Sequence, residues 1–284
     1  MRVIFMGTPD FAVPSLEALL TKHEVVLVVT QPDKPKGRGK KMVPTPVKAC
    51  ALEHGIPVLQ PEKVKEPEFV EQLRSYEPDL IAVTAFGQIL SEPILEMPKY
   101  RGAAPMQWSI IDGEKVTGIT TMYMAKGLDS GDMLLKAEVE ITDEDTFATI
   151  HDKMAVTGAN LLLDTLDQLE AGTLERIPQD HDAATYAPMI TKETGHIDWS
   201  KNRQDIINLI RGLNPVPAAY TIYEEEVLKI FGAVISDVQA DDAANGEIVA
   251  VVKKGFVVKC GDGCVLISEV QARGGKRMMT DAYL

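Results

Sequence analysis

The opening of the chain constrains its fold more than any other segment. Residues 2–6 form a short apolar run, residues 7–11 break it, and residues 14–20 place leucines along one helical face. This succession predicts the strand, turn and helix that open a doubly wound α/β fold, in which ligands bind beyond the carboxyl ends of the strands. A dinucleotide site would need Gly-x-Gly-x-x-Gly, and only Gly7 is present, which favours a ligand other than NAD. Alone, these residues are equally typical of a plain βα turn.

Strand and helix signals alternate through the first half of the chain. The apolar runs at residues 25–29 and 80–84 lack polar alternation, as parallel strands covered on both faces do. We expect helices at residues 44–55, 66–76 and 145–171, and a further strand near residues 118–124. The first half is therefore predicted to be a Rossmann-like, doubly wound parallel sheet.

The last third of the chain has a different pattern. A helix is expected at residues 202–213, and short β-rich runs follow it at residues 219–223, 227–235, 246–252, 256–260 and 265–270. This pattern predicts a small OB-like β-barrel, although other small barrels and sandwiches have similar patterns. The residues between the two patterns lose their periodicity and contain two prolines. We therefore expect domains at residues 1–172 and 191–284, joined by a linker at residues 173–190.

A basic patch stands out in an otherwise acidic chain. The net charge of −13 argues against a protein that coats nucleic acid nonspecifically. Residues 33–48 nevertheless contain only one acidic residue and six basic residues. The basic residues are Lys34, Lys36, Arg38, Lys40, Lys41 and Lys48. Such a run is either a solvated loop or a surface for phosphate groups.

Composition indicates the cellular compartment. No apolar run reaches the roughly 18–20 residues that a membrane span needs, and no signal-peptide pattern opens the chain. Three cysteines do not indicate a disulfide framework, and Cys260 and Cys264 lack the further ligands that tetrahedral zinc requires. We therefore expect a cytoplasmic protein without a membrane partner or a bound metal.

Three segments are expected to leave the carboxyl ends of strands and to meet at one edge of the sheet. They are residues 7–11, 85–90 and 128–133. Residues 85–90 offer backbone donors and acceptors around a glycine. Asp129 lies beside a glycine turn and would suit a general base if it were partly buried. Each segment alone commonly just caps a turn, so their shared placement is the stronger indication of a site.

Over nearly its whole length, the chain resembles the 10-formyltetrahydrofolate-dependent transformylases, and among them those that act on methionyl-tRNA. The matching stretches are residues 6–11, 30–41, 45–48, 85–90, 100–105, 124–133, 197–200 and 211–217. The resemblance implies a formyl-folate-binding Rossmann-like domain and a barrel that helps to hold tRNA. It also implies transfer of a formyl group from 10-formyltetrahydrofolate to the free amino group of methionyl-initiator tRNA, by a protein that we expect to be monomeric.

The resemblance assigns roles to particular residues. Asp129 matches a catalytic aspartate that assists proton removal from the attacking amine. The pterin pocket would be lined by Phe86, Gly87, Gln88, Ile89 and Leu90. Residues 31–41 match an inserted loop that engages the tRNA acceptor arm, here through Arg38, Lys40 and Lys41. The planar guanidinium of Arg38 suits phosphate or base edges.

One feature of the family is absent. Its members carry Asn-x-His on a strand, followed by a Ser-Leu-Leu-Pro loop, before the segment matched by residues 100–105. Here Lys99 passes directly into Tyr100, and none of the five histidines stands in an equivalent place. Formyl transfer passes through a tetrahedral oxyanion, and losing one positioned donor typically costs about 100- to 1,000-fold in rate. Asp129 alone would not make a competent enzyme.

Two explanations of the absent block are open. Either the working protein contains it and this sequence omits it, or the block is a true deletion. Omission is favoured, because a parallel sheet that loses an inner strand forfeits two hydrogen-bonded ladders. A true deletion at the Lys99–Tyr100 junction would leave a catalytically dead module that binds folate or tRNA.

A third alternative concerns the acceptor. The fold and the formyl donor would be kept, and the formyl group would pass to a nucleotide-linked amino sugar or a small amine. The Arg38 loop and the β-rich second domain argue against this alternative.

Overall fold

The computed structural model describes residues 1–36, 41–88, 105–125, 131–180 and 187–284. The chain divides into two compact units. We call Met1–Gly102, Gly118–Val139 and Asp152–Tyr186 the N-terminal unit, and Ala103–Thr117, Glu140–His151 and Ala187–Leu284 the C-terminal unit. None of the described helices is long and apolar enough to cross a membrane.

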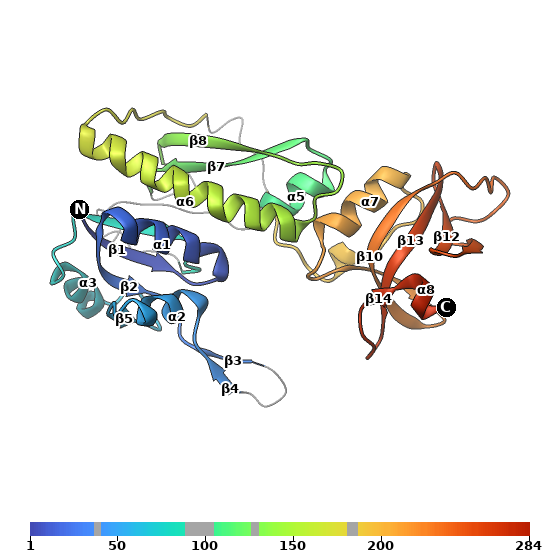
Figure 1. Ribbon diagram of the computed structural model, residues 1–284, viewed down its shortest axis with the longest axis horizontal. Helices are drawn as coiled ribbons and strands as arrows, with labels where there is room; N and C mark the ends of the chain where they lie inside the picture. The colour runs from blue at the N-terminus through green and yellow to red at the C-terminus, as the bar shows by residue number, and fades with distance from the viewer. Residues whose placement is uncertain (37–40, 89–104, 126–130, 181–186) are drawn as a thin grey trace. The chain divides into compact units, whose positions relative to one another are not determined.

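A parallel sheet forms the centre of the N-terminal unit (Figure 1). Its order is β5-β2-β1-β6, and its strands are β1 (Arg2–Gly7), β2 (Glu24–Val29), β5 (Val58–Leu59) and β6 (Leu80–Thr84). Val3 packs into one apolar cluster, and Ile4, the next residue of β1, packs into a second. Both faces of the strand are therefore covered, as the unbroken apolar runs predict.

Helices cover both faces of this sheet, which confirms the doubly wound fold. One apolar cluster includes η1 (Asp10–Ala12), α1 (Val13–Lys22), α2 (Pro46–Glu53) and α6 (Phe147–Ala171), and the other includes α3 (Pro67–Arg74). Local chemistry explains the start of α2. Pro46 occupies its first turn, and the Thr45 hydroxyl accepts a hydrogen bond from the backbone nitrogen of Lys48 at 3.2 Å. The three helices expected in this half are confirmed, with ends that differ by a few residues.

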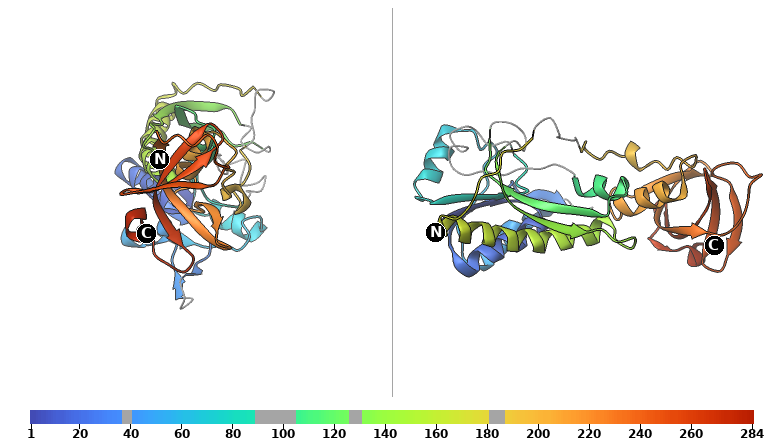
Figure 2. Two further views of the ribbon diagram at one scale, coloured as in Figure 1. Left: turned by 90° about the vertical axis from the view of Figure 1, so that its right-hand side faces the viewer. Right: turned by 90° about the horizontal axis from the view of Figure 1, so that it is seen from above.

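Two further strand pairs are separate from the parallel sheet. β7 (Val116–Met122) pairs with β8 (Met133–Glu140), so the strand expected near residues 118–124 exists but does not join the main sheet within the described residues. β3 (Lys34–Lys36) and β4 (Lys41–Val43) form an antiparallel hairpin that projects from the N-terminal unit (Figures 1 and 2). The basic run therefore has strand arms on either side of residues 37–40, which lie outside the described residues.

The C-terminal unit contains an antiparallel sheet. Its strand order is β11-β12-β13-β10-β9, and β14 pairs with β13. Its strands are β9 (Ala219–Tyr223), β10 (Glu226–Ser236), β11 (Ile248–Val252), β12 (Gly255–Cys260), β13 (Gly263–Ala272) and β14 (Met278–Met279). Its helices are α5 (Pro105–Ile111), η2 (Glu193–Gly195), α7 (Arg203–Gly212) and α8 (Thr280–Tyr283). The sheet shares an apolar cluster with Ile206 and Ile210 of α7. The expected helix and five strands are confirmed, and they form a small barrel-like domain.

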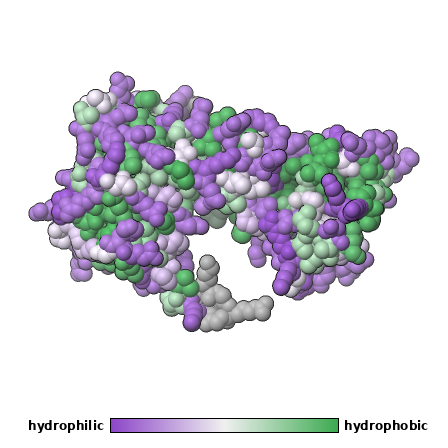
Figure 3. Space-filling model, viewed as in Figure 1, coloured by the Kyte–Doolittle hydropathy of each residue, from purple (hydrophilic) through white to green (hydrophobic). Residues whose placement is uncertain are grey.

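Apolar side chains also reach the outer surface of this unit. Figure 3 shows hydrophobic patches over the barrel strands. Val234 and Ile235 of β10 and Val251 of β11 are each more than half exposed. Exposed apolar patches commonly mark surfaces that contact other molecules.

Arg211 ties α7 to a distant segment of the same unit. Its side chain is 6% exposed, and one terminal nitrogen donates to the carbonyl oxygens of Thr142 at 2.6 Å and Asp145 at 3.3 Å. Its Nε donates to Oδ1 of Asn208 at 3.0 Å. Burial lowers the pKa of Arg211, but a guanidinium remains charged at neutral pH. The charge is therefore held by two backbone carbonyls and the Asn208 side-chain oxygen.

Replacing Arg211 with methionine is expected to lower the free energy of unfolding by about 2–4 kcal/mol, because two carbonyl oxygens lose their charged donor. Urea denaturation of the full chain measures the change. The matched control is Arg273→Met, whose guanidinium pairs with Glu226 at 3.1 Å on the surface and whose loss should cost less than about 1 kcal/mol. Equal losses in the two variants would contradict the role given to Arg211.

Candidate functional site

The loops that follow β1, β2 and β6 are joined at the carboxyl edge of the parallel sheet. The Thr8 hydroxyl donates to the carbonyl oxygen of Phe86 at 2.9 Å and accepts from the backbone nitrogen of Gln31 at 3.3 Å. The Gln31 side chain donates to the same carbonyl of Phe86 at 3.3 Å. In a doubly wound fold this edge is where ligands bind. The three loops are therefore held in one arrangement by bonds between residues far apart in the sequence.

The turn after β6 separates a buried residue from an exposed one. Phe86 is 3% exposed and packs in the same apolar cluster as Met124. Gly87 follows it at φ +83°, a left-handed conformation that favours glycine, and is exposed. Gly87 can therefore offer its backbone to a ligand, while the buried Phe86 ring fixes the turn by packing in the apolar cluster. Both residues stay predicted members of a folate pocket.

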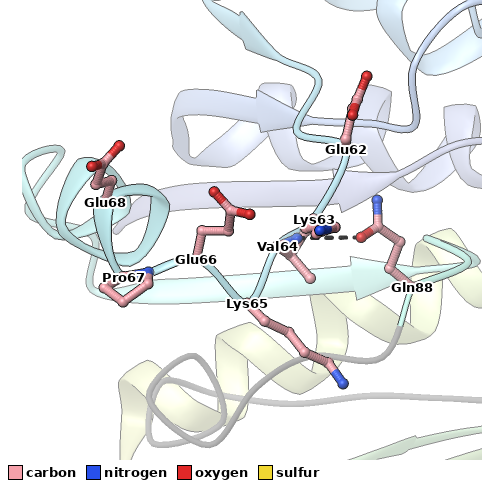
Figure 4. Close-up of a pocket in the computed structure, with 8 residues that line it drawn as sticks. All are labelled: Glu62, Lys63, Val64, Lys65, Glu66, Pro67, Glu68 and Gln88. Atoms are coloured by element: carbon pink, nitrogen blue, oxygen red, sulfur yellow. Dashed lines mark hydrogen bonds between the residues drawn. The ribbon is translucent and has the colours of Figure 1, made fainter.

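Gln88 faces an open hollow of about 730 Å³ (Figure 4). Its lining residues are Glu62, Lys63, Val64, Lys65, Glu66, Pro67, Glu68 and Gln88. The Gln88 amide accepts from the backbone nitrogen of Val64 at 3.3 Å and donates to the carbonyl oxygen of Pro61 at 3.2 Å. Gln88 thus ties the loop after β5 to the loop after β6, a role that its place in a pterin pocket does not suggest.

A second polar group lies at the base of the basic hairpin. The Lys48 ammonium donates to Asp33 and to Gln60, both at 2.6 Å, and the Gln60 amide donates to Asp33 at 2.7 Å and to the carbonyl oxygen of Gln31 at 2.8 Å. The Lys48 hydrogen bond lowers the pKa of Asp33. Lys48 therefore holds Asp33, the residue that precedes β3, whereas Lys34 and Lys41 are exposed on the hairpin. Sequence reasoning missed Asp33 and Gln60, because no spacing relates them.

Five predicted site residues lie outside the described residues, namely Arg38, Lys40, Ile89, Leu90 and Asp129. The junction of Lys99 with Tyr100 lies outside them as well. The described neighbours of Asp129 are informative, because Met124 shares an apolar cluster with Phe86. Met124, which shortly precedes residues 126–130, is therefore held in the same apolar cluster as the turn after β6.

The cysteines of the barrel are buried. Cys260 and Cys264 are both inaccessible, and the Cys260 thiol donates to the carbonyl oxygen of Gly263 at 3.4 Å. Burial raises the pKa of Cys260, so the thiol stays protonated at neutral pH. Among the described residues, no group of three or more His, Cys, Asp or Glu side chains could hold a metal ion.

Both parts of the chain match known families. The family model described as "Formyl transferase" matches residues 1–166. The model described as "Formyl transferase, C-terminal domain" matches residues 189–284. The two matches together cover the parallel sheet and the barrel.

Curated relatives align with the whole chain. Methionyl-tRNA formyltransferase from Acetivibrio thermocellus is 51% identical over 298 positions, which cover 100% of this chain and 96% of the relative. The protein of the same name from Ruminiclostridium cellulolyticum is 52% identical over 299 positions, with the same coverage. The first alignment is 14 positions longer than the 284 residues of this chain.

Solved structures share the fold at low identity. HypX from Aquifex aeolicus, solved in complex with tetrahydrofolic acid, matches with a TM-score of 0.64 and 18% identity over 100% of this chain and 47% of HypX. WlaRD, a sugar 3N-formyl transferase solved with dTDP and 5-N-formyl-THF, matches with a TM-score of 0.65 and 16% identity over 96% of this chain and 97% of that protein. At such identities the likeness concerns the fold alone.

Proposed function

Because this chain belongs to the formyl transferase family, we propose that it transfers a formyl group from 10-formyltetrahydrofolate to the free amino group of methionyl-initiator tRNA. The observation that carries the proposal is the identity of about half of all positions with methionyl-tRNA formyltransferases along the full chain. The reaction would take place in the cytoplasm, with the protein acting as a monomer.

The formyl donor is proposed to bind beside the turn after β6. Phe86, Gly87 and Gln88 would form this wall together with Ile89 and Leu90. Gly87 supports the assignment, because its exposed backbone lies at the edge where ligands bind in this fold. Thr8, Gln31 and Gln88 would act by holding the turn, since their polar groups already bind neighbouring loops.

The acceptor is proposed to reach the site from the basic hairpin. Arg38, Lys40 and Lys41 would contact the tRNA acceptor arm, and the barrel at residues 191–284 would hold the remainder of the tRNA. Residues 173–190 would link this domain to the catalytic domain at residues 1–172. Single-stranded tRNA ends are recognised through phosphates and splayed bases, which the exposed cations of the hairpin suit.

The proposed chemistry is an acyl transfer with Asp129 as the base. The methionyl α-amine attacks the formyl carbon, and a new C–N bond forms. Asp129 takes a proton from the attacking nitrogen and delivers it to N10 of tetrahydrofolate, which leaves when its bond to the formyl carbon breaks. An asparagine amide and a histidine imidazole would stabilise the oxyanion that forms between these steps.

These two donors belong to the absent block, and we propose that the active protein contains it between Lys99 and Tyr100. Two observations support this. The Acetivibrio relative aligns over 14 more positions than this chain has residues. Among the described residues, β6 is also the last strand on its side of the parallel sheet, whereas β7 and β8 form a separate pair. A strand added beside β6 would extend the sheet on that side, and its carboxyl end would lie next to the turn that follows β6.

Replacing Arg38 with alanine is expected to lower kcat/KM for methionyl-tRNA by about 10- to 100-fold, because a charged contact to phosphate or base is lost. The protein with the block is assayed with charged initiator tRNA and, side by side, with a nucleotide-linked amino sugar. The wild-type protein should formylate only the tRNA. Transfer to the amino sugar that is unchanged in Arg38→Ala would favour the alternative acceptor instead.

A further inference from the structure

Residues after α6 return to the start of β8. Met133, the first residue of β8, and Ile177 exchange two backbone hydrogen bonds, both 2.8 Å long. Ile177 belongs to the segment expected as a linker, and it forms an isolated bridge there. Two backbone bonds in register fix the position of one segment against the other.

Two side chains strengthen this contact on either side of Ile177. Arg176 Nε lies 3.0 Å from Oδ2 of Asp132, and its guanidinium lies 4.5 Å from the centre of the Tyr123 ring. The Gln179 amide donates to the carbonyl oxygen of Gly131 at 2.7 Å. We call Arg176, Ile177 and Gln179 the linker anchor. It binds three successive residues, Gly131 to Met133.

The residues on either side of the segment that contains Asp129 are also in direct contact, through Tyr123 and Asp132. The backbone nitrogen of Tyr123 donates to the carbonyl oxygen of Asp132 at 2.9 Å. A Cβ on Gly131 would overlap the carbonyl oxygen of Tyr123, so only glycine fits at this position. Residues 131–133, which follow residues 126–130, are thus held in position both by Tyr123 and by the linker anchor.

From these contacts we propose that Arg176 and Gln179 are positioning residues for formyl transfer, because they hold the residues that immediately follow Asp129. This inference rests on the proposed function. Asp129 lies two residues before Gly131 in the sequence, so a shift of Gly131 would be passed along the backbone to the base. Arg176 is also not a free cation for tRNA, since Asp132 and Tyr123 already engage it.

Gln179→Glu removes the amide donor and faces the Gly131 carbonyl with an oxygen. We expect kcat to fall by about 10- to 100-fold, because small misplacements of reacting groups slow the chemical step to this extent. KM for both substrates should stay within about 3-fold of the wild-type value. Arg176→Met should lower kcat by about 5-fold, because an exposed ion pair and a cation–π contact are lost. Arg176→Lys, which keeps the charge, should recover most of this loss. A change in KM alone, or no change in kcat, would overturn the proposal.

The matched control is Arg74→Met, which removes a similarly exposed pair with Glu71 elsewhere in the same unit. Its kcat should equal that of the wild type. Should Gln179→Glu fail to fold, Arg176→Met remains informative, since its pair is on the surface.

Backbone hydrogen exchange separates this proposal from the proposed function. In the full chain, peptides covering residues 123–133 should exchange at least about 10-fold faster in Arg176→Met and Gln179→Glu than in wild type or Arg74→Met, as loss of local protection requires. This readout needs no substrate. Unchanged exchange would overturn the positioning role, whereas faster exchange in variants whose block-containing parent formylates no methionyl-tRNA would count against the proposed function.

Discussion

Replacing Asp129 with asparagine is expected to lower kcat for formyl transfer by about 100- to 10,000-fold, the range in which a positioned general base contributes. Asparagine keeps the size of the side chain but cannot take the proton from the attacking amine. KM for both substrates should change little, because the carboxylate acts on the reacting nitrogen. Single-turnover formylation, with enzyme in excess over charged tRNA, measures the chemical step.

The nearby Asp132 provides the matched control for this variant. Its carboxylate lies three residues further along the chain and pairs with Arg176 at 3.0 Å. Asp132→Asn should lower kcat only about as far as Arg176→Met does, since it removes the same exposed pair. An Asp129→Asn protein that keeps kcat within a few fold of wild type would show that the base lies elsewhere.

Inserting the absent block between Lys99 and Tyr100 is expected to raise the formylation rate by at least about 100-fold over the 284-residue chain. The aligned segment of the Acetivibrio relative is a suitable donor, because the two chains are 51% identical. The physical reason is that a developing oxyanion is poorly stabilised when no aligned hydrogen-bond donors face it. The measurement is the initial rate with saturating formyl donor and charged initiator tRNA.

A second insertion separates chemistry from folding. The same block with its asparagine and histidine changed to alanine restores the chain length and the strand but supplies neither donor. We expect this protein to be as stable as the active insertion and to react almost as slowly as the uninserted chain. If the uninserted chain already formylates as fast as the active insertion, the block is dispensable and the role given to its two donors is wrong.

The sheet and its helices could be predicted because their signals are local. An unbroken apolar run such as residues 80–84 becomes a strand buried on both faces, and Thr45 with Pro46 marks the start of α2. The five barrel strands are separated by turn residues and have apolar patterns, so their positions in the sequence were also predicted to within a few residues. β8 was missed because its charged residues mask the strand pattern, and β3 and β4 because three-residue strands rich in lysine resemble a loop.

The contacts that hold the site could not be predicted, because they join residues without a shared pattern. Gln31 and Gln88 bind backbone groups of loops that are tens of positions away, and one sequence contains no sign of such pairs. Lys48 was grouped with the basic patch by its charge, yet Asp33 engages it. Arg176 lies in a stretch that lost its periodicity, which is typical of a linker and conceals its contact with Asp132.

The most direct test of the central claim follows the formyl carbon itself. The block-containing protein is mixed in a single turnover with 10-formyltetrahydrofolate that is labelled in its formyl group and with methionyl-initiator tRNA. We predict that the label appears on the methionine amino group, with one tetrahydrofolate released for each formyl group transferred. Label that remains on the folate or is released as formate, although both substrates are bound, would contradict the account.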